Sequence, residues 1–134
     1  MPPLILLVED DPTLQILGKS QFKVLGFDVD IAGSGEDAIA KTKENRYSLI
    51  FMDISMPGMS GIEATLHIRE SELRAQQPRT PIIAMTAYSQ RQEALGAGMD
   101  AFVQKPVLLD VLTRLCLQWL PPDHLSAKLR GEGV

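Results

Sequence analysis

The sequence predicts a single α/β domain, in which an open parallel β-sheet carries helices on both faces. Two observations lead to this prediction. Four short apolar runs, and one stretch in which apolar and polar residues alternate, are separated by segments of helical periodicity, and a length of 134 residues suits one domain. Successive strand–helix–strand units connect in a right-handed sense, so their helices cover both faces of a parallel sheet.

The first half of the chain shows these elements in order. The run 4–7 is expected to form the first strand. Asp11 and Pro12 then mark a helix start, because an acidic side chain caps free backbone N–H groups and proline suits the first helical position. Gly26 is expected to end that helix. Apolar and polar residues alternate over 27–32, which predicts a strand near an edge of the sheet.

The remaining elements repeat the pattern of an apolar run followed by a helix with its own start signal. They are a helix from Ser34, a strand over 49–51, a helix with the capping box of Ser60 and Glu63, a strand over 82–85, a short helix capped by Ser89, a strand over 101–103 and a last helix over 108–119. Prolines at 121 and 122 stop the last helix. We therefore expect one domain over 1–121 and a flexible tail or linker start over 122–134.

Composition and charge argue against several classes of protein. The net charge of −4 disfavours nonspecific attraction to nucleic acid or to a membrane surface. No apolar stretch approaches the roughly 20 residues of a membrane span, and no basic leader for export is visible. The single cysteine, Cys116, lies in an apolar run and is expected to be a core thiol in a reducing compartment. We therefore expect a cytoplasmic protein with no nucleic-acid or membrane partner.

Charged and polar residues follow the expected strands at the point where each strand ends. Glu9 and Asp10 follow the first strand, Asp53 the third, Thr86 the fourth and Lys105 the fifth. In an open parallel sheet, ligands bind outside the carboxyl ends of the strands. If these strands are neighbours, the five side chains form an acidic crevice with one hydroxyl and one ammonium group. Such a crevice suits a divalent cation and a group of the size of a phosphate.

The chemistry of this crevice favours phosphoryl transfer to Asp53. A carboxylate at an exposed strand end can attack phosphorus and form an acyl phosphate. Three carboxylates together repel by roughly 4 kcal/mol per close pair at intermediate dielectric, and a divalent cation removes that penalty. Mg2+ prefers one or two carboxylates together with waters and phosphate oxygens. Lys105 would pair with the anionic centre, and Thr86 would donate a hydrogen bond to a phosphate oxygen.

Together these motifs resemble those of the response-regulator receiver domains of two-component signalling. The resemblance covers about residues 4–120 and rests on Glu9-Asp10, Asp53, Thr86-Ala87 and Lys105-Pro106. It implies a flavodoxin-like fold, which is a doubly wound five-stranded parallel sheet with the strand order 2-1-3-4-5. The stretch 52–69 resembles the receivers of hybrid kinases and phosphorelays especially. Leu14 and Leu108 depart from that subfamily, which often has asparagine and a polar helix cap at these positions.

The resemblance also implies a role for each residue of the crevice. Asp53 would be the phosphoacceptor. Mg2+ would be bound by Glu9, Asp10, Asp53 and Ser55, with Glu9 acting through water and Ser55 through its backbone carbonyl. The phosphoryl group would be bound, and the switch operated, by Thr86, Ala87, Phe102 and Lys105. The rate of dephosphorylation would be tuned by Ser55 and Tyr88.

The implied function is that of a switch and not of an enzyme with a turnover substrate. A histidine kinase or a histidine phosphotransfer protein would donate a phosphoryl group to Asp53. The domain would catalyse only its own Mg2+-dependent phosphorylation and dephosphorylation. The new charge would change an output face over residues 87–120, which would bind a downstream protein or a second copy of the chain.

Three other functions fit the sequence less well. Many Mg2+-dependent phosphatases with an aspartyl nucleophile carry a second aspartate two residues later, where this chain has Ser55. A flavin-binding module needs backbone amides for a phosphate after the first strand, whereas residues 9–12 would repel a phosphate and include a proline. A degenerate receiver that only binds proteins would have no need of an intact Asp53, Thr86 and Lys105.

Overall fold

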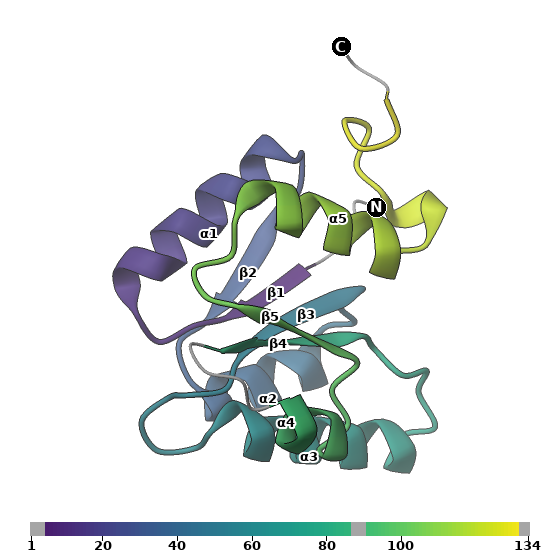
Figure 1. Cartoon of the computed structure of the whole chain (residues 1–134). Coiled ribbons are helices and arrows are strands. Elements are labelled where there is room, and N and C mark those ends of the chain that lie inside the picture. The colour runs from purple at the N-terminus through teal and green to yellow at the C-terminus, as the bar shows by residue number, and fades with distance from the viewer. Residues whose placement is uncertain (1–4, 87–90, 132–134) are drawn as a thin grey trace.

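The computed structural model describes residues 5–86 and 91–131, and within them five strands alternate with five α-helices (Figure 1). Each of these helices is too short or too polar to cross a bilayer. The strands are β1 (Ile5–Val8), β2 (Val29–Ala32), β3 (Leu49–Asp53), β4 (Ile82–Thr86) and β5 (Ala101–Gln104). The helices are α1 (Pro12–Val24), α2 (Gly35–Glu44), α3 (Gly61–Arg74), α4 (Arg91–Gly96) and α5 (Leu109–Trp119), followed by a short 3₁₀ helix, η1 (Pro122–His124).

The sheet is parallel throughout and has the order β2-β1-β3-β4-β5. The doubly wound fold and its strand order are therefore confirmed. In Figure 1, α1 and α5 cover one face of the sheet, and α2, α3 and α4 cover the other. β2 lies at an edge, as the alternation over 27–32 predicts.

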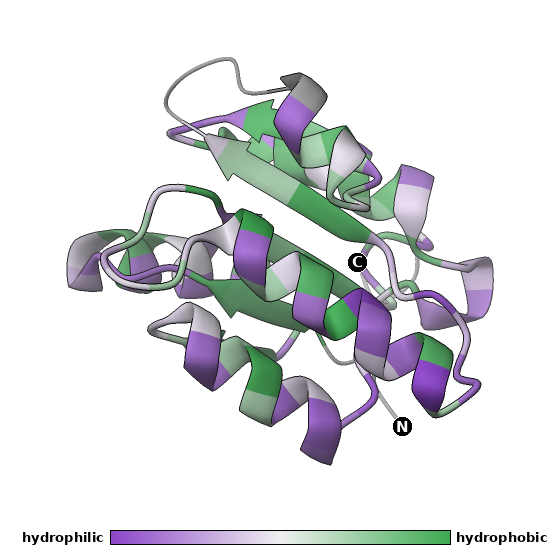
Figure 2. Ribbon diagram, turned by 90° about the horizontal axis from the view of Figure 1, so that it is seen from below, coloured by the Kyte–Doolittle hydropathy of each residue, from purple (hydrophilic) through white to green (hydrophobic). Residues whose placement is uncertain are grey.

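Successive strand residues point to opposite faces of the sheet and so build two separate cores. In β1, Leu6 and Val8 belong to the core on the side of α2 and α3, whereas Ile5 and Leu7 belong to the core on the side of α1 and α5. Figure 2 shows that the strands are mostly hydrophobic, while the helices alternate hydrophilic and hydrophobic residues. Burial of this apolar area, at about 25 cal/mol per Å² removed from water, drives the two layers of helices onto the sheet.

β5 is less buried than the sequence predicts. The apolar run 101–103 is typical of a buried strand, but its residues are half-buried and Gln104 is exposed. The reason is its place at the edge of the sheet, where β4 is its one neighbouring strand.

The helix starts follow the expected capping pattern with one exception. Asp11 caps α1 by accepting hydrogen bonds from two backbone N–H groups of the first turn, at 2.8 and 3.3 Å. Ser34 and Ser60 cap α2 and α3 in the same way. α5 begins after Leu108, whose side chain makes no capping bond. The cap expected at Ser89 lies outside the described residues.

Cys116 is fully buried in the core on the side of α1 and α5. Burial raises the pKa of its thiol to about 12. The thiol therefore stays protonated at neutral pH and is a poor nucleophile. The expectation of a core thiol is confirmed.

The segment that follows α5 packs against the domain, which differs from the flexible tail expected for 122–134. Leu125 and Leu129 contact the core on the side of α1 and α5. The buried hydroxyl of Ser126 donates to the carbonyl oxygen of Leu25 and accepts from the N–H of Leu129. Isolated leucines in a polar stretch are typical of a loop, so the sequence pattern carries no sign of these contacts. The domain boundary at residue 121 stays a prediction.

We expect Ser126→Ala to lower the free energy of unfolding by about 1–2 kcal/mol, because the Leu25 carbonyl and the Leu129 amide both lose a partner in a buried position. Urea unfolding followed by circular dichroism measures the change. Lys128→Ala is the matched control, since Lys128 belongs to the same segment and is exposed. Equal stability of the two variants would show that the hydrogen bonds of Ser126 contribute nothing to the stability of the fold.

Candidate functional site

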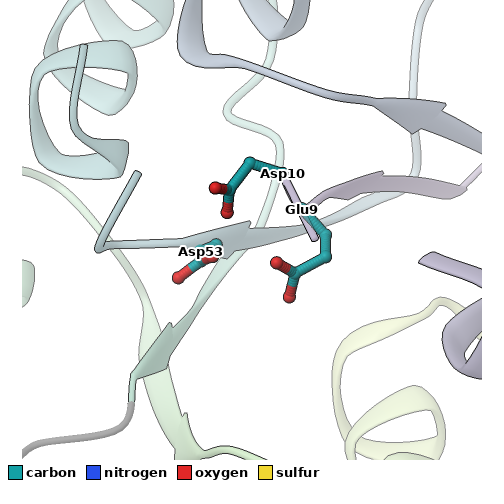
Figure 3. Close-up of side chains that lie close together, drawn as sticks. All are labelled: Glu9, Asp10 and Asp53. Atoms are coloured by element: carbon teal, nitrogen blue, oxygen red, sulfur yellow. The ribbon is translucent and has the colours of Figure 1, made fainter. Parts of the chain in front are cut away.

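Three carboxylates meet at the carboxyl end of the sheet (Figure 3). Glu9 and Asp10 directly follow β1, and Asp53 is the last residue of β3. β1 and β3 pair with Val8 opposite Met52, so the residues that come next, Glu9 and Asp53, lie at the same level. One oxygen of each carboxylate lies within 4.8 Å of the others. The structure therefore brings together the three acidic residues that the sequence places at strand ends.

Lys105 bridges two of these carboxylates. Its Nζ lies 2.9 Å from Glu9 Oε1 and 3.1 Å from Asp53 Oδ2. The backbone N–H of Lys105 donates to the carbonyl oxygen of Thr86 at 2.8 Å, which extends the pairing of β4 and β5 by one residue and aims the side chain across β4. Glu9 and Asp53 are only 2% and 1% exposed. Their charges are therefore poorly solvated and depend on the ammonium group.

Burial raises the pKa of Asp53 from an ordinary value of 3.8 to about 6. The hydrogen bond from Lys105 acts in the opposite direction, and the charge of Glu9 adds to the increase. Burial lowers the pKa of Lys105, but its hydrogen bonds to Glu9 and Asp53 outweigh that effect and leave the pKa above its ordinary value. Lys105 thus stays charged at neutral pH. The pKa of Asp53, at about 6, lies only slightly below neutral pH.

The cluster carries more negative than positive charge. When Glu9, Asp10 and Asp53 are all ionised, three carboxylates face one ammonium and leave two negative charges uncompensated. Carboxylate oxygens, together with water, are the ligands that Mg2+ prefers. The donor set therefore fits a hard divalent cation, whose charge equals the deficit of the cluster.

The remaining residues singled out from the sequence lie around Asp53 or outside the described chain. The backbone N–H of Ser55 donates to Asp53 Oδ1 at 3.2 Å, and the Ser55 side chain is exposed. Thr86 ends β4 and is buried. Phe102 in β5 is half-buried and packs against the core on the side of α2 and α3. Two further residues fall outside the described part of the chain: Ala87 and Tyr88.

Gly61 allows α3 to begin directly against the backbone of Asp53. A Cβ at this position would lie 2.0 Å from the carbonyl oxygen of Asp53 and 2.8 Å from its carbonyl carbon. Backbone atoms within a buried strand cannot move aside, so a larger residue would push α3 away from β3. The N–H of Gly61 also donates to the carbonyl oxygen of Ile54 at 3.0 Å. Gly61 therefore closes the loop that follows Asp53.

Two glutamines of α1 contact the loops around the site, and no motif in the sequence marks them. Gln15 Nε2 donates to the carbonyl oxygen of Glu9 at 2.6 Å. Gln21 Nε2 donates to the carbonyl oxygen of Val107 at 2.8 Å. A glutamine in an amphipathic helix is usually a solvated residue, so the pattern alone does not reveal such contacts.

A family model of the response regulator receiver domain matches residues 5–116, which include all five strands. This chain is a response regulator receiver domain. Its role is that of a phosphoacceptor in two-component or phosphorelay signalling. As a receiver domain it is a signalling module and not a classical enzyme.

Curated relatives of this receiver domain are much longer proteins. The sensor protein EvgS of Escherichia coli K12 is 36% identical over an alignment that covers 94% of this chain and 10% of EvgS. Probable histidine kinase 1 of Oryza sativa subsp. indica is 34% identical, with 89% of this chain and 16% of that protein covered. The transcription factor SKN7 of Chaetomium thermophilum is 38% identical, with 96% and 17% covered. The chain therefore spans about a tenth to a sixth of these relatives, and the match to sensor kinases is consistent with a phosphorelay receiver.

Solved structures show the same fold. A co-crystal structure of the Saccharomyces cerevisiae histidine phosphotransfer protein Ypd1 with the receiver domain of Ssk1 matches with a TM-score of 0.85 and 30% identity, covering 92% of both chains. The receiver domain of the sensor histidine kinase PA1611 from Pseudomonas aeruginosa, solved with a magnesium ion coordinated in its active-site cleft, matches with a TM-score of 0.78 and 33% identity. That match covers 89% of this chain and 98% of the PA1611 chain.

We expect Asp53→Asn to stabilise the metal-free receiver at alkaline pH. The pKa of Asp53 is raised by folding, so its favourable contribution is complete at low pH and is lost as the pH rises through about 6. A neutral amide avoids the cost of the buried charge. The free energy of unfolding should rise by on the order of 1–3 kcal/mol at a pH of about 8 and change much less at a pH of about 4.

Urea unfolding in the presence of a chelator, at both pH values, measures this difference. Asp28→Asn is the control, because Asp28 is exposed and its substitution removes the same charge from the surface. If the wild type and Asp53→Asn had parallel pH profiles, ionised Asp53 would carry no burial cost and the charge imbalance of the cluster would be refuted.

Proposed function

We propose that Asp53 is the phosphoacceptor of this receiver, and that its phosphoryl group comes from a phosphohistidine on a histidine kinase or a histidine phosphotransfer protein. The observation that carries the proposal is the buried Asp53 carboxylate at the end of β3, which is bonded to Lys105 and flanked by two further carboxylates. The complex of Ypd1 with the Ssk1 receiver supports a partner of this kind.

In this proposal Asp10 and Asp53 bind Mg2+ directly, the backbone carbonyl of Ser55 is a third ligand, and Glu9 acts through water. The oxygens that lie within 4.8 Å of one another support this assignment, as does the magnesium ion in the cleft of the PA1611 receiver. When bound, Mg2+ would neutralise charge on the phosphoryl oxygens and offset the repulsion among the carboxylates.

The transfer is a substitution at phosphorus. A carboxylate oxygen of Asp53 forms the new O–P bond while the N–P bond to the donor imidazole breaks, and the bonding electron pair stays on the imidazole nitrogen. Because the pKa of Asp53 is about 6, most copies carry the nucleophilic carboxylate at neutral pH. Lys105 then pairs with a phosphoryl oxygen, and the hydroxyl of Thr86 donates a hydrogen bond to another.

The signal would end when water hydrolyses the acyl phosphate. Ser55 and Tyr88, which stand two residues beyond Asp53 and Thr86 in the sequence, are proposed to set the rate of this step. The exposed position of the Ser55 side chain next to Asp53 supports its part in the proposal. Phosphorylation and dephosphorylation of its own aspartate are the only reactions that we assign to the domain.

We further propose that the output face is formed by α4, β5 and α5, within residues 87–120. Phe102 and Lys105 belong to β5 and to the turn that follows it, so a rearrangement at the site reaches this edge strand directly. Four leucines on these helices or directly before α5 leave 40–60% of their surface exposed: Leu95, Leu108, Leu109 and Leu117. An exposed apolar set of this kind suits a downstream protein or a second copy of the chain.

The acidic net charge and the buried, unpaired Cys116 support a cytoplasmic protein without a nucleic-acid or membrane partner.

The central test uses phosphoramidate, whose P–N bond resembles that of a phosphohistidine. Incubation with Mg2+ should add one phosphoryl group per chain, which intact-mass spectrometry detects. Reduction with borohydride followed by peptide mapping should locate the group on Asp53. Asp53→Asn should lose the modification, whereas Asp123→Asn, which removes an exposed carboxylate far along the sequence, should keep it. Modification of Asp53→Asn at the level of the wild type would refute the assignment.

The output face is tested by NMR in the presence of Mg2+ and beryllofluoride, an analogue of the phosphoryl group. Because Lys105 and Phe102 connect the site to β5, we expect amide resonances of residues 91–120 to shift more than those of α2. Leu109→Ala should weaken binding of a partner or self-association without changing phosphorylation, since Leu109 is exposed and lies outside the acidic cluster. Shifts concentrated in α1 instead would contradict an output face formed by α4, β5 and α5.

A further inference from the structure

Asp10 differs from the other members of the acidic cluster in how its side chain is held. The carboxylate of Glu9 accepts a hydrogen bond from the N–H of Asp11 at 3.1 Å and forms an ion pair with Lys105 at 2.9 Å. Asp53 accepts bonds from Lys105 and from the N–H of Ser55. Among residues 5–86 and 91–131, the structure shows no hydrogen bond or ion pair to the Asp10 carboxylate. With no such bond, the position from which this carboxylate reaches toward Asp53 is set by the Cα–Cβ bond of Asp10, whose direction the backbone fixes.

The backbone of Asp10 is fixed by a side chain of α1. The carbonyl oxygen of Glu9 belongs to the peptide unit that links Glu9 to Asp10, and this oxygen accepts the Nε2–H of Gln15 at 2.6 Å. On the other side, the N–H of Glu9 donates to the carbonyl oxygen of Ala32 at 3.0 Å, which continues the pairing of β1 with β2. A planar peptide unit has no internal freedom, so holding its oxygen sets the orientation in which the chain enters Asp10.

We propose that Gln15 is a positioning residue for the divalent-cation site. Its amide holds the peptide unit between Glu9 and Asp10 so that the Asp10 carboxylate faces Asp53, without touching the cation itself. The inference rests on the proposed role of Asp10 as a Mg2+ ligand. Groups that orient metal ligands in this way contribute strongly to affinity, and their loss typically weakens binding by about 10–100-fold.

The test compares two glutamines of the same helix. Gln15→Met keeps the length of the side chain and removes the donor. Gln21→Met is the matched control, because Gln21 also donates to a backbone carbonyl, at 2.8 Å, but that carbonyl belongs to Val107 and not to the acidic loop. We expect Mg2+ affinity, measured by calorimetry, to fall about tenfold in Gln15→Met and to stay within about twofold of the wild type in Gln21→Met.

Two further readouts separate positioning from general stability and from the proposed function. In the wild-type protein, Mg2+ titration followed by NMR should shift the side-chain amide resonance of Gln15 and leave that of Gln21 in place, a result that needs no variant to fold. Asp10→Asn should weaken Mg2+ binding more than Gln15→Met does.

The outcomes are distinguishable. Undiminished Mg2+ affinity in Gln15→Met, together with weak binding in Asp10→Asn, would overturn the inference and leave the proposed function intact. Undiminished affinity in Asp10→Asn would overturn the assignment of Asp10 as a ligand, and the positioning role with it. An unmoved Gln15 resonance during the Mg2+ titration would also contradict the inference.

Discussion

Lys105 holds two carboxylates, Glu9 and Asp53, that are almost completely removed from water. Each of these charges would cost several kcal/mol if it were buried without a partner. The contact exists only because the strands of the sheet are parallel, so that the carboxyl ends of β1, β3 and β5 lie at the same end of the sheet. β4 lies between β3 and β5. The same alignment brings in the third carboxylate, Asp10, and one ammonium cannot balance three. The resulting excess of negative charge is the property that would bind a divalent cation.

The opposite end of the sheet shows what a balanced cluster looks like. There the guanidinium of Arg69 lies 2.8 Å from Glu72 and 2.9 Å from Asp100, and Arg79 pairs with Asp100 as well. Two arginines thus face two carboxylates, and the group ties α3 to the start of β4 and β5. This end has a structural explanation alone. The cluster with excess negative charge lies at the end that carries Asp53, and a functional site is where a protein is expected to depart from the rules of stability.

Periodicity in the sequence was sufficient to predict the layers and the parallel sheet, because these follow from the alternation of strands and helices. The meeting of Glu9, Asp10 and Asp53 could be predicted as well, because all three follow the ends of strands in that sheet. Contacts that depend on the direction of single side chains could not be predicted. Gln15 and Arg69 look like surface residues of amphipathic helices, but they bind backbone carbonyls across the fold. Ser126 lies in a polar stretch and is buried because two nearby leucines pack onto the core. The half-buried state of β5 follows from its edge position, which no local pattern encodes.

The charge of this site depends on the pH at which Asp53 ionises in the metal-free domain. Carbon-13 NMR of selectively labelled aspartate carboxyl groups, followed as the pH is changed, gives the midpoint of the ionisation of Asp53 directly. We expect Asp53 of the wild type to ionise with a midpoint at a pH of about 6. Lys105→Met should raise it further, because the hydrogen bond and charge that favour the ionised form are lost, and Mg2+ should lower it. A midpoint at the ordinary value of 3.8 that does not respond to Lys105→Met would contradict the claim that burial and a single ammonium set the charge of this site.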